Sequence, residues 1–295
     1  MAFHRRNKLR GSPSGRAASV APREPSEPAG QRMSMRRRGI YILPNLFTTA
    51  ALFCGFYAIV QAMNQRFYEA GVAIFVAMVL DSLDGRVARM TNTQSEFGAE
   101  YDSLSDMVSF GVAPALVMYE WALKGMGKLG WIAAFIYVAG AALRLARFNT
   151  NIAIVDKRFF QGLPSPSAAA LAAGFVWVMN DYNVAGNDVR WIAWVIAVYA
   201  GMTMVSNVPF YSFKDINLRK SVPFIFVFAI VLVFTLISVD PPTVLFGLFC
   251  LYGLAGYVLY VWRLIKGKPV SIISTEPEPT IGPSAKQLDD DAAGR

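Results

Sequence analysis

Four aspartates with regular spacing are the residues of this chain best suited to carry out chemistry. They lie in one stretch of a chain in which only 16% of the residues are charged: Asp81, Asp84, Asp102 and Asp106. At 100° per residue, Asp81 and Asp84 share one face of a helix, and Asp102 and Asp106 share one face of the next. Oxygen ligands alone favour hard cations such as Mg²⁺ or Mn²⁺. The spacing therefore predicts a divalent-cation site between two helices.

Small residues and an arginine accompany the first pair of aspartates. Gly85, Ala88 and Arg89 fall on the same helix face as Asp81 and Asp84. The small residues leave room for an extended group to reach the helix, and the guanidinium fork of an arginine suits phosphate. Cations beside such an arginine are typical of phosphoryl transfer, where they offset charge on the attacking and leaving groups. The alternative is a salt-bridge network within a membrane.

Long apolar segments must position these aspartates. The chain is 55% hydrophobic and 16% charged, whereas a soluble domain carries about 25% charged residues. Its apolar blocks are about 20 residues long, enough to cross a hydrocarbon core of roughly 30 Å. We therefore predict an all-α fold, a polytopic transmembrane helix bundle with about eight spans, at 41–63, 67–88, 103–123, 129–148, 162–180, 189–207, 222–239 and 243–263. The Asp240-Pro241-Pro242 turn should separate the last two, because proline breaks a helix.

The distribution of basic residues predicts the orientation. Of the 28 lysines and arginines, 24 fall on one side of the predicted spans. By the positive-inside rule, both termini and the aspartates lie on the cytoplasmic side of the plasma (inner) membrane. Residues 1–38 are interpreted as a disordered basic cytoplasmic arm that is attracted to anionic lipid headgroups. Residues 269–295 are interpreted as a disordered cytoplasmic tail. The arm lacks interleaved aromatic residues, so no nucleic-acid partner is expected.

Histidine and cysteine are too scarce to supply other chemistry. The single histidine is His4, in the basic arm, so a histidine-ligated zinc or haem site is excluded and proton transfer must use a carboxylate or another group. Cys54 and Cys250 fall inside apolar spans and are interpreted as small hydrophobic residues.

The aspartate stretch fits the pattern D-x2-D-G-x2-A-R-x8-G-x3-D-x3-D and thereby resembles the CDP-alcohol phosphotransferase family. The specified positions are Asp81, Asp84, Gly85, Ala88, Arg89, Gly98, Asp102 and Asp106. The resemblance implies that a hydroxyl nucleophile displaces CMP from a CDP-linked lipid or alcohol. It implies that the four aspartates bind two divalent cations, Mg²⁺ or Mn²⁺, and that Asp106 is the general base.

The same resemblance implies a lipid-substrate site and a domain organisation. The candidates for CDP-diacylglycerol binding are Asn45, Thr48, Gly85, Ala88, Arg89 and Ser95. The implied catalytic membrane core has six helices and occupies residues 39–220. Two additional C-terminal transmembrane helices, within 221–268, fall outside that core and have no assigned role. The resemblance also implies a homodimer.

Three further stretches resemble the phosphatidylserine synthases of this family: 43–48 (LPNLFT), 143–149 (LRLARFN) and 162–168 (GLPSPSA). They imply CDP-diacylglycerol and L-serine as substrates and phosphatidylserine and CMP as products. Arg144, Arg147 and Ser165 are then candidates for binding the serine carboxylate or a phosphate. Other interpretations stay open: a helix start at 43–45, cytoplasmic anchors for the two arginines, and a turn that leads into a helix at 162–168.

Two other functions are weighed against this one. The aspartate pattern does not distinguish serine from another acceptor, such as glycerol 3-phosphate, inositol phosphate, choline or phosphatidylglycerol. A cation-coupled transporter also uses carboxylates in a membrane, but it predicts acidic residues near the bilayer centre in matching halves. Here the acids gather at one side and the second half has no matching pair. A non-catalytic scaffold does not require this pattern.

Overall fold

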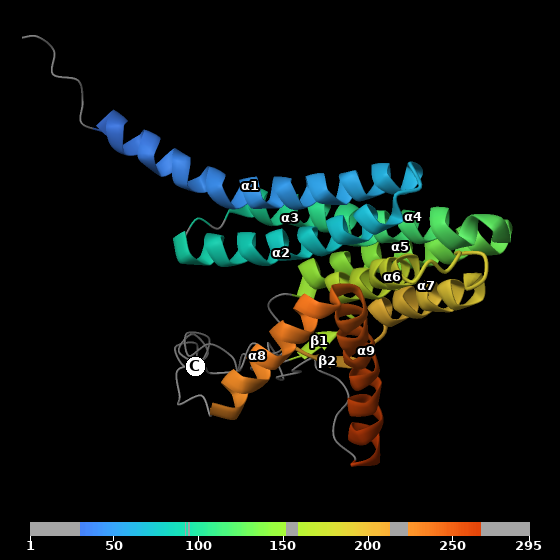
Figure 1. The fold of residues 1–295 in the computed structure, drawn as a ribbon. Helices are drawn as coiled ribbons and strands as arrows, with labels where there is room; N and C mark the ends of the chain where they lie inside the picture. The colour runs from blue at the N-terminus through green and yellow to red at the C-terminus, as the bar shows by residue number, and fades with distance from the viewer. Residues whose placement is uncertain (1–29, 92, 94, 152–158, 213–223, 267–295) are drawn as a thin grey trace, which may run out of the picture. The chain divides into compact units, whose positions relative to one another are not determined.

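The computed structural model describes residues 30–91, 93, 95–151, 159–212 and 224–266, and this part of the chain is mostly helical (Figure 1). Its first helices are α1 (Gly30–Met63), α2 (Phe67–Thr91), α3 (Glu96–Asp106), α4 (Ala113–Met118) and α5 (Lys128–Asn151). The later elements are β1 (Phe159–Gln161), α6 (Ser165–Asp181), α7 (Arg190–Val205), β2 (Pro209–Tyr211), α8 (Phe224–Val239) and α9 (Pro241–Ile265). Strands β1 and β2 pair antiparallel, with Phe160 opposite Phe210.

A helical segment occupies each of the eight predicted apolar stretches. The third is composite: a π-helical segment, Met107–Val112, joins α3 to α4, and a second one, Tyr119–Leu123, follows α4. Among the described residues, three helical stretches are long and apolar enough to cross a membrane by length and composition: Pro44–Met63, Lys128–Thr150 and Pro241–Ile265. The number of eight crossings stays a prediction.

Two expectations about helix boundaries are corrected. The interpretation of residues 43–45 as a helix start is wrong, because α1 begins at Gly30 and Pro44 lies inside it. The predicted disordered arm, 1–38, overlaps the beginning of α1, while its residues 1–29 and the predicted tail lie outside the described residues. By contrast, the expected break between the last two helices is confirmed: Asp240 caps α9 by accepting a hydrogen bond from the amide of Thr243, at 3.2 Å.

Helix α6 is buried along almost its whole length. From Ser165 to Val178 every residue except Pro166 is buried, and the helix packs against α2, α4, α7 and α9. Its apolar residues on every side suit this central position. Close packing depends on small residues: a Cβ at Gly71 of α2 would lie 2.8 Å from that of Trp177 of α6. This packing leaves Ser165, the first residue of α6, with no exposed surface.

A buried tyrosine satisfies a backbone group that a proline leaves free. Pro114 has no N–H to donate to the carbonyl of Phe110, four residues earlier. The hydroxyl of Tyr137 on α5 donates to this carbonyl at 3.0 Å, and the side chains of Phe110 and Tyr137 are both fully buried. We expect Tyr137→Phe to lower the free energy of unfolding by about 1–3 kcal/mol, because it leaves a buried carbonyl unpaired. Chemical unfolding in detergent measures the change.

The matched control is Tyr68→Phe, which removes a hydroxyl from a tyrosine that is 45% exposed. It should leave the free energy of unfolding within about 0.5 kcal/mol of the parent protein. Equal unfolding free energies for the Tyr137→Phe variant and the parent protein would contradict the role assigned to this hydrogen bond.

Candidate active site

Three carboxylates from two helices converge at one point of the structure. Asp81 comes from α2, and Asp102 and Asp106 lie one turn apart at the end of α3. Each offers one oxygen atom, and these three atoms all lie within 4.8 Å of one another. The side chains of Asp81 and Asp106 are in direct hydrogen-bonding contact. This arrangement has the size and the ligand chemistry of a site for a hard divalent cation.

Asp84 lies beside this group and has a partner of its own. Its side chain is 5% exposed, and its Oδ2 accepts a hydrogen bond of 2.8 Å from the hydroxyl of Thr48 on α1. The charge of Asp84 nevertheless acts on Asp102. The structure thus brings all four predicted aspartates into one electrostatic cluster, and in three of them one oxygen atom each lies within 4.8 Å of the others.

Two oxygen atoms in the cluster are buried without a protein partner. Among the described residues, Asp102 Oδ1 and Asp106 Oδ1 have no hydrogen-bond donor. Burial, together with the smaller effects of the charges of Asp84 and Asp81, raises the pKa of Asp102 to about 7. Buried carboxylates of like charge are unfavourable unless a cation or donors offset the charge. The residues present therefore fit a bound divalent cation.

Contacts with α1 hold α3 in place beside the cluster. The hydroxyl of Ser105 donates to the carbonyl of Thr48 at 3.1 Å, and that of Ser109 donates to the carbonyl of Ala51 at 3.1 Å. Gly55 permits this approach, since a Cβ there would lie 2.5 Å from Ser109 Oγ. Sequence reasoning missed the two serines, because their partners lie more than 50 residues away and no local spacing marks them. A π-helical segment follows Asp106 directly, and such segments are frequent at functional sites.

The residues expected to bind CDP-diacylglycerol fall into two groups around the aspartates. Gly85, Ala88 and Arg89 lie on the exposed end of α2, where a Cβ at Gly85 would be 3.6 Å from Arg89 Nη1. The second group surrounds the start of α3. A Cβ at Gly98 would lie 3.1 Å from Ser95 Oγ and 3.5 Å from Asn45 Oδ1.

Ser95 also has a structural function, which is to cap α3. Its Oγ accepts a hydrogen bond from the amide of Gly98 at 3.0 Å. Such a cap stabilises a helix by about 1 kcal/mol. Thr48 of α1 is buried, and its hydroxyl donates a hydrogen bond to the carboxylate of Asp84. This hydrogen bond connects Thr48 to the aspartate cluster.

Arg144 and Ser165 form a buried polar pair next to the aspartates. Arg144 on α5 is 8% exposed and donates to Ser165 Oγ at 2.7 Å. Its charge also acts on Asp106. The Nε of Arg144 has no partner among the described residues. A buried guanidinium with a free donor can bind an anionic group, such as a carboxylate or a phosphate.

Arg147, one helical turn later, does not share this function. Its two terminal nitrogens donate to five internal acceptors, which lie on β1 and at the end of α7: the carbonyls of Gln161, Met204, Val205 and Ser206, and the side chain of Asn207. These contacts occupy the donors that a substrate carboxylate would need. The expectation that Arg147 binds serine is therefore corrected: the side chain holds the end of α7, and of the two arginines on α5 only Arg144 remains as a candidate for binding the acceptor.

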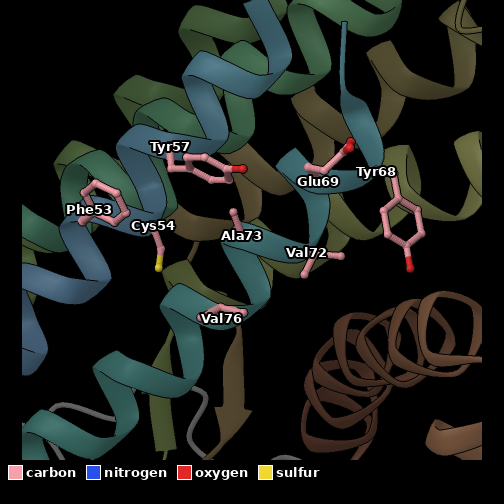
Figure 2. A pocket seen from close by; sticks show the side chains of 8 residues that line it. All are labelled: Phe53, Cys54, Tyr57, Tyr68, Glu69, Val72, Ala73 and Val76. Atoms are coloured by element: carbon pink, nitrogen blue, oxygen red, sulfur yellow. The ribbon is translucent and has the colours of Figure 1, made fainter. Parts of the chain in front are cut away.

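A separate pocket lies between α1 and α2 (Figure 2). It has a volume of about 390 Å³ and eight lining residues, mostly apolar: Phe53, Cys54, Tyr57, Tyr68, Glu69, Val72, Ala73 and Val76. None of the predicted site residues lines it. With a single carboxylate and no basic residue, it lacks the groups that phosphoryl transfer requires, so the candidate active site is the aspartate cluster.

Comparison with known proteins identifies related sequences. The family model described as CDP-alcohol phosphatidyltransferase matches residues 41–203. A protein of Helicobacter pylori named CDP-diacylglycerol–serine O-phosphatidyltransferase is 36% identical over 233 residues, covering 78% of this chain and 96% of that protein. Proteins of the same name from Methanocaldococcus jannaschii (35% identical, 64% of this chain and 82% of that protein) and Saccharomyces cerevisiae (33%, 60% and 62%) are also similar. The matched residues include the aspartate cluster and Arg144.

Proposed function

The chain is a member of the CDP-alcohol phosphatidyltransferase family, and from this membership we propose that it is a membrane phosphatidylserine synthase. In the proposed reaction a phosphatidyl group passes from CDP-diacylglycerol to the hydroxyl of L-serine, giving phosphatidylserine and CMP. The observation that carries the proposal is the convergence of three aspartate oxygens within 4.8 Å, next to a buried arginine. The choice of serine rests on the shared name of the relatives.

The chain's own residues supply orientation and proton transfer. The guanidinium of Arg144 binds the serine carboxylate, with Ser165 holding that guanidinium in place. Asp106, whose charge Arg144 offsets, accepts the proton of the serine hydroxyl as the general base. The serine oxygen then bonds to the phosphorus that carries diacylglycerol, and the bond from that phosphorus to the oxygen of CMP breaks.

Metal ions belong to the proposed site. Asp81, Asp84, Asp102 and Asp106 are the residues that would hold two divalent cations, Mg²⁺ or Mn²⁺. When bound, these ions offset the negative charge of the diphosphate and of the departing CMP. Arg89 and the small residues Gly85 and Ala88 bind the diphosphate of CDP-diacylglycerol. Asn45, Thr48 and Ser95 complete that binding site: Asn45 and Ser95 lie together at the start of α3, and Thr48 acts through Asp84.

The proposed function also places the chain in a membrane. We assign all eight apolar helical segments as spans, with 39–220 as the catalytic core and α8 and α9 as additions. Both termini and the aspartates face the cytoplasm, as the basic residues predict. The acyl chains of the lipid substrate then stay in the bilayer while its CDP group reaches the aspartates. A homodimer completes the proposal and is tested by the mass of the detergent-solubilised protein.

Release of CMP tests the reaction. Purified protein in detergent is given CDP-diacylglycerol and Mn²⁺ or Mg²⁺, with and without L-serine. We expect CMP to appear only when both serine and a divalent cation are present. CMP release with glycerol 3-phosphate, inositol phosphate or choline, and not with serine, would agree with the reaction of the family but would show that serine is not the acceptor. No release with any acceptor and either metal would contradict the proposed function.

Metal binding should depend on pH in the range where Asp102 titrates. Its raised pKa of about 7 means that a proton competes with the cation at lower pH. The affinity of the site for the cation is therefore highest well above pH 7 and falls as the pH is lowered through 7. We expect the apparent Mn²⁺ affinity, measured by calorimetry, to be about tenfold weaker at pH 6 than at pH 8. The Asp102→Asn variant should bind Mn²⁺ more weakly and with less pH dependence; equal affinity of the parent protein at both pH values would contradict the assignment.

A further inference from the structure

Helix α9 lies outside the residues matched by the family model, yet it contacts the strand pair that leads into α6. Figure 1 shows strand β2 beside α9, and the two are in contact. A Cβ at Gly256 would overlap the ring of Phe210, which is fully buried. The ring of Tyr252 packs 5.5 Å from that of Phe210, and its hydroxyl donates to the carbonyl of Tyr211 at 3.2 Å. Helix α9 thus holds β2 by packing and by a hydrogen bond.

The strand pair in turn determines the position of Ser165. In the pair, Gln161 of β1 lies opposite Pro209 of β2. The next residue, Gly162, donates from its amide to the carbonyl of Val208 at 2.9 Å. Its φ of +74° is favourable only for glycine, so the chain turns sharply here. Ser165 begins α6 three residues later, and its place is therefore tied to β2.

Ser165 and Tyr252 both interact with the anion-binding arginine. Arg144 donates to Ser165 Oγ at 2.7 Å, and it lies close enough to Tyr252 for the two groups to interact electrostatically. From the same helix, Arg147 donates to the carbonyl of Gln161 at 3.0 Å. The strand pair is therefore held both by α5, through Arg147, and by α9, through Tyr252, and Arg144 interacts with Ser165 and Tyr252.

We propose that α9 is a positioning element for the acceptor site, acting through Gly256 and Tyr252 on the strand pair that places Ser165, the hydrogen-bond partner of Arg144. This inference rests on the proposed function, since it assigns Arg144 to the carboxylate of the acceptor. The phenol of Tyr252 does not touch the reacting atoms: it holds β2 and borders the guanidinium. Loss of either contact shifts Ser165, and Arg144 then binds the acceptor less well, while the CDP-diacylglycerol site on α1, α2 and α3 is unaffected.

Two substitutions on α9 test the proposal, each with a matched control. Gly256→Ala places a methyl group against Phe210, whereas Gly247→Ala adds one where no atom lies within 4 Å. Tyr252→Phe removes the hydrogen bond to the carbonyl of Tyr211. Its control is Tyr199→Phe, which also removes a hydrogen bond from a tyrosine hydroxyl to a backbone carbonyl. This hydrogen bond, to the carbonyl of Gly253 at 3.1 Å, joins α7 to α9 and does not involve β2.

The measured quantities are the KM for L-serine, the KM for CDP-diacylglycerol, kcat and the unfolding temperature. We expect the serine KM to rise about tenfold in Gly256→Ala, because a small displacement of a binding group has a large effect. It should rise roughly threefold to tenfold in Tyr252→Phe. The lipid KM should stay within about twofold in both variants, and both KM values should stay unchanged in the two controls.

Three results overturn the proposal. The first is an unchanged serine KM in the folded Tyr252→Phe variant, which decides the question if Gly256→Ala does not fold. The second is a rise of the KM for serine and the KM for CDP-diacylglycerol by the same factor. The third is a rise of the serine KM in Tyr199→Phe as large as that in Tyr252→Phe. Either result would mean that α9 only stabilises the fold. A parent protein that releases no serine-dependent CMP contradicts the proposed function itself, and the inference is then rejected with it.

Discussion

Replacing Asp106 by asparagine should lower kcat about 10³-fold, the size of a general base's contribution. Asparagine has nearly the same shape but cannot accept the proton of the serine hydroxyl. The site is built around this carboxylate: its oxygen lies within 4.8 Å of those of Asp81 and Asp102, and the charge of Arg144 acts on it. Its Oδ1 is buried and has no donor among the described residues. Serine-dependent CMP release in detergent measures the effect.

The control for this variant is Asp181→Asn, at an exposed aspartate on the last turn of α6. It should leave kcat unchanged. The lipid KM of Asp106→Asn should change much less than kcat, because the residue acts mainly on the transition state. If Asp106→Asn retained more than about a tenth of kcat, the base would have to be another group. Loss of Mn²⁺ binding together with a pH–rate profile of unchanged shape would assign Asp106 to the metal alone.

Replacing Arg144 by glutamine should raise the serine KM about 100-fold. Removing one partner of a buried, hydrogen-bonded charge pair costs 2–5 kcal/mol, and each 1.4 kcal/mol is a factor of ten in affinity. Arg144 is 8% exposed and has a free Nε, which makes it the anion-binding candidate that the structure leaves open. Initial rates of CMP release over a range of serine concentrations give the KM, and the lipid KM measured in parallel serves as the reference.

Two neighbouring substitutions separate binding from folding. Ser165→Ala should raise the serine KM only roughly threefold to tenfold, because it removes one hydrogen bond to Arg144 and leaves the charge in place. Arg147→Gln should lower the unfolding temperature, because it frees the carbonyls at the end of α7. A larger serine KM effect from Arg147→Gln than from Arg144→Gln, in folded protein, would reverse the functions assigned to the two arginines.

Local sequence patterns were sufficient to find the helices and the acidic residues. The eight apolar stretches all contain helix, because an apolar run of that length encodes a helix without reference to the rest of the chain. The spacing of Asp102 and Asp106 likewise places them on one face, since four residues make about one turn. The Asp240-Pro241-Pro242 stretch also predicted the break before α9, because proline is disfavoured in the interior of a helix. All of these are properties of a few consecutive residues.

The functions of the two arginines could not be separated in this way. Arg144 and Arg147 lie three residues apart, and both are basic residues near the end of a predicted span. Their difference comes from what surrounds each of them after folding. Arg144 faces Ser165, whereas Arg147 reaches the end of α7, about 60 residues later in the chain. At Pro44 the local pattern was misleading: proline usually marks a helix start, but here α1 continues through it.

Residue types and their spacing were enough to identify the groups suited to catalysis: four aspartates at helical spacing, an arginine with small residues beside it, and apolar helices that position them. Which of these groups meet depends on the folded chain. The tertiary structure placed Thr48 on Asp84, brought Asp81 to Asp102 and Asp106, and set α9 against the strand pair behind Ser165. The physical reason is that helix periodicity depends on neighbouring residues, whereas these contacts depend on the packing of segments far apart in the chain.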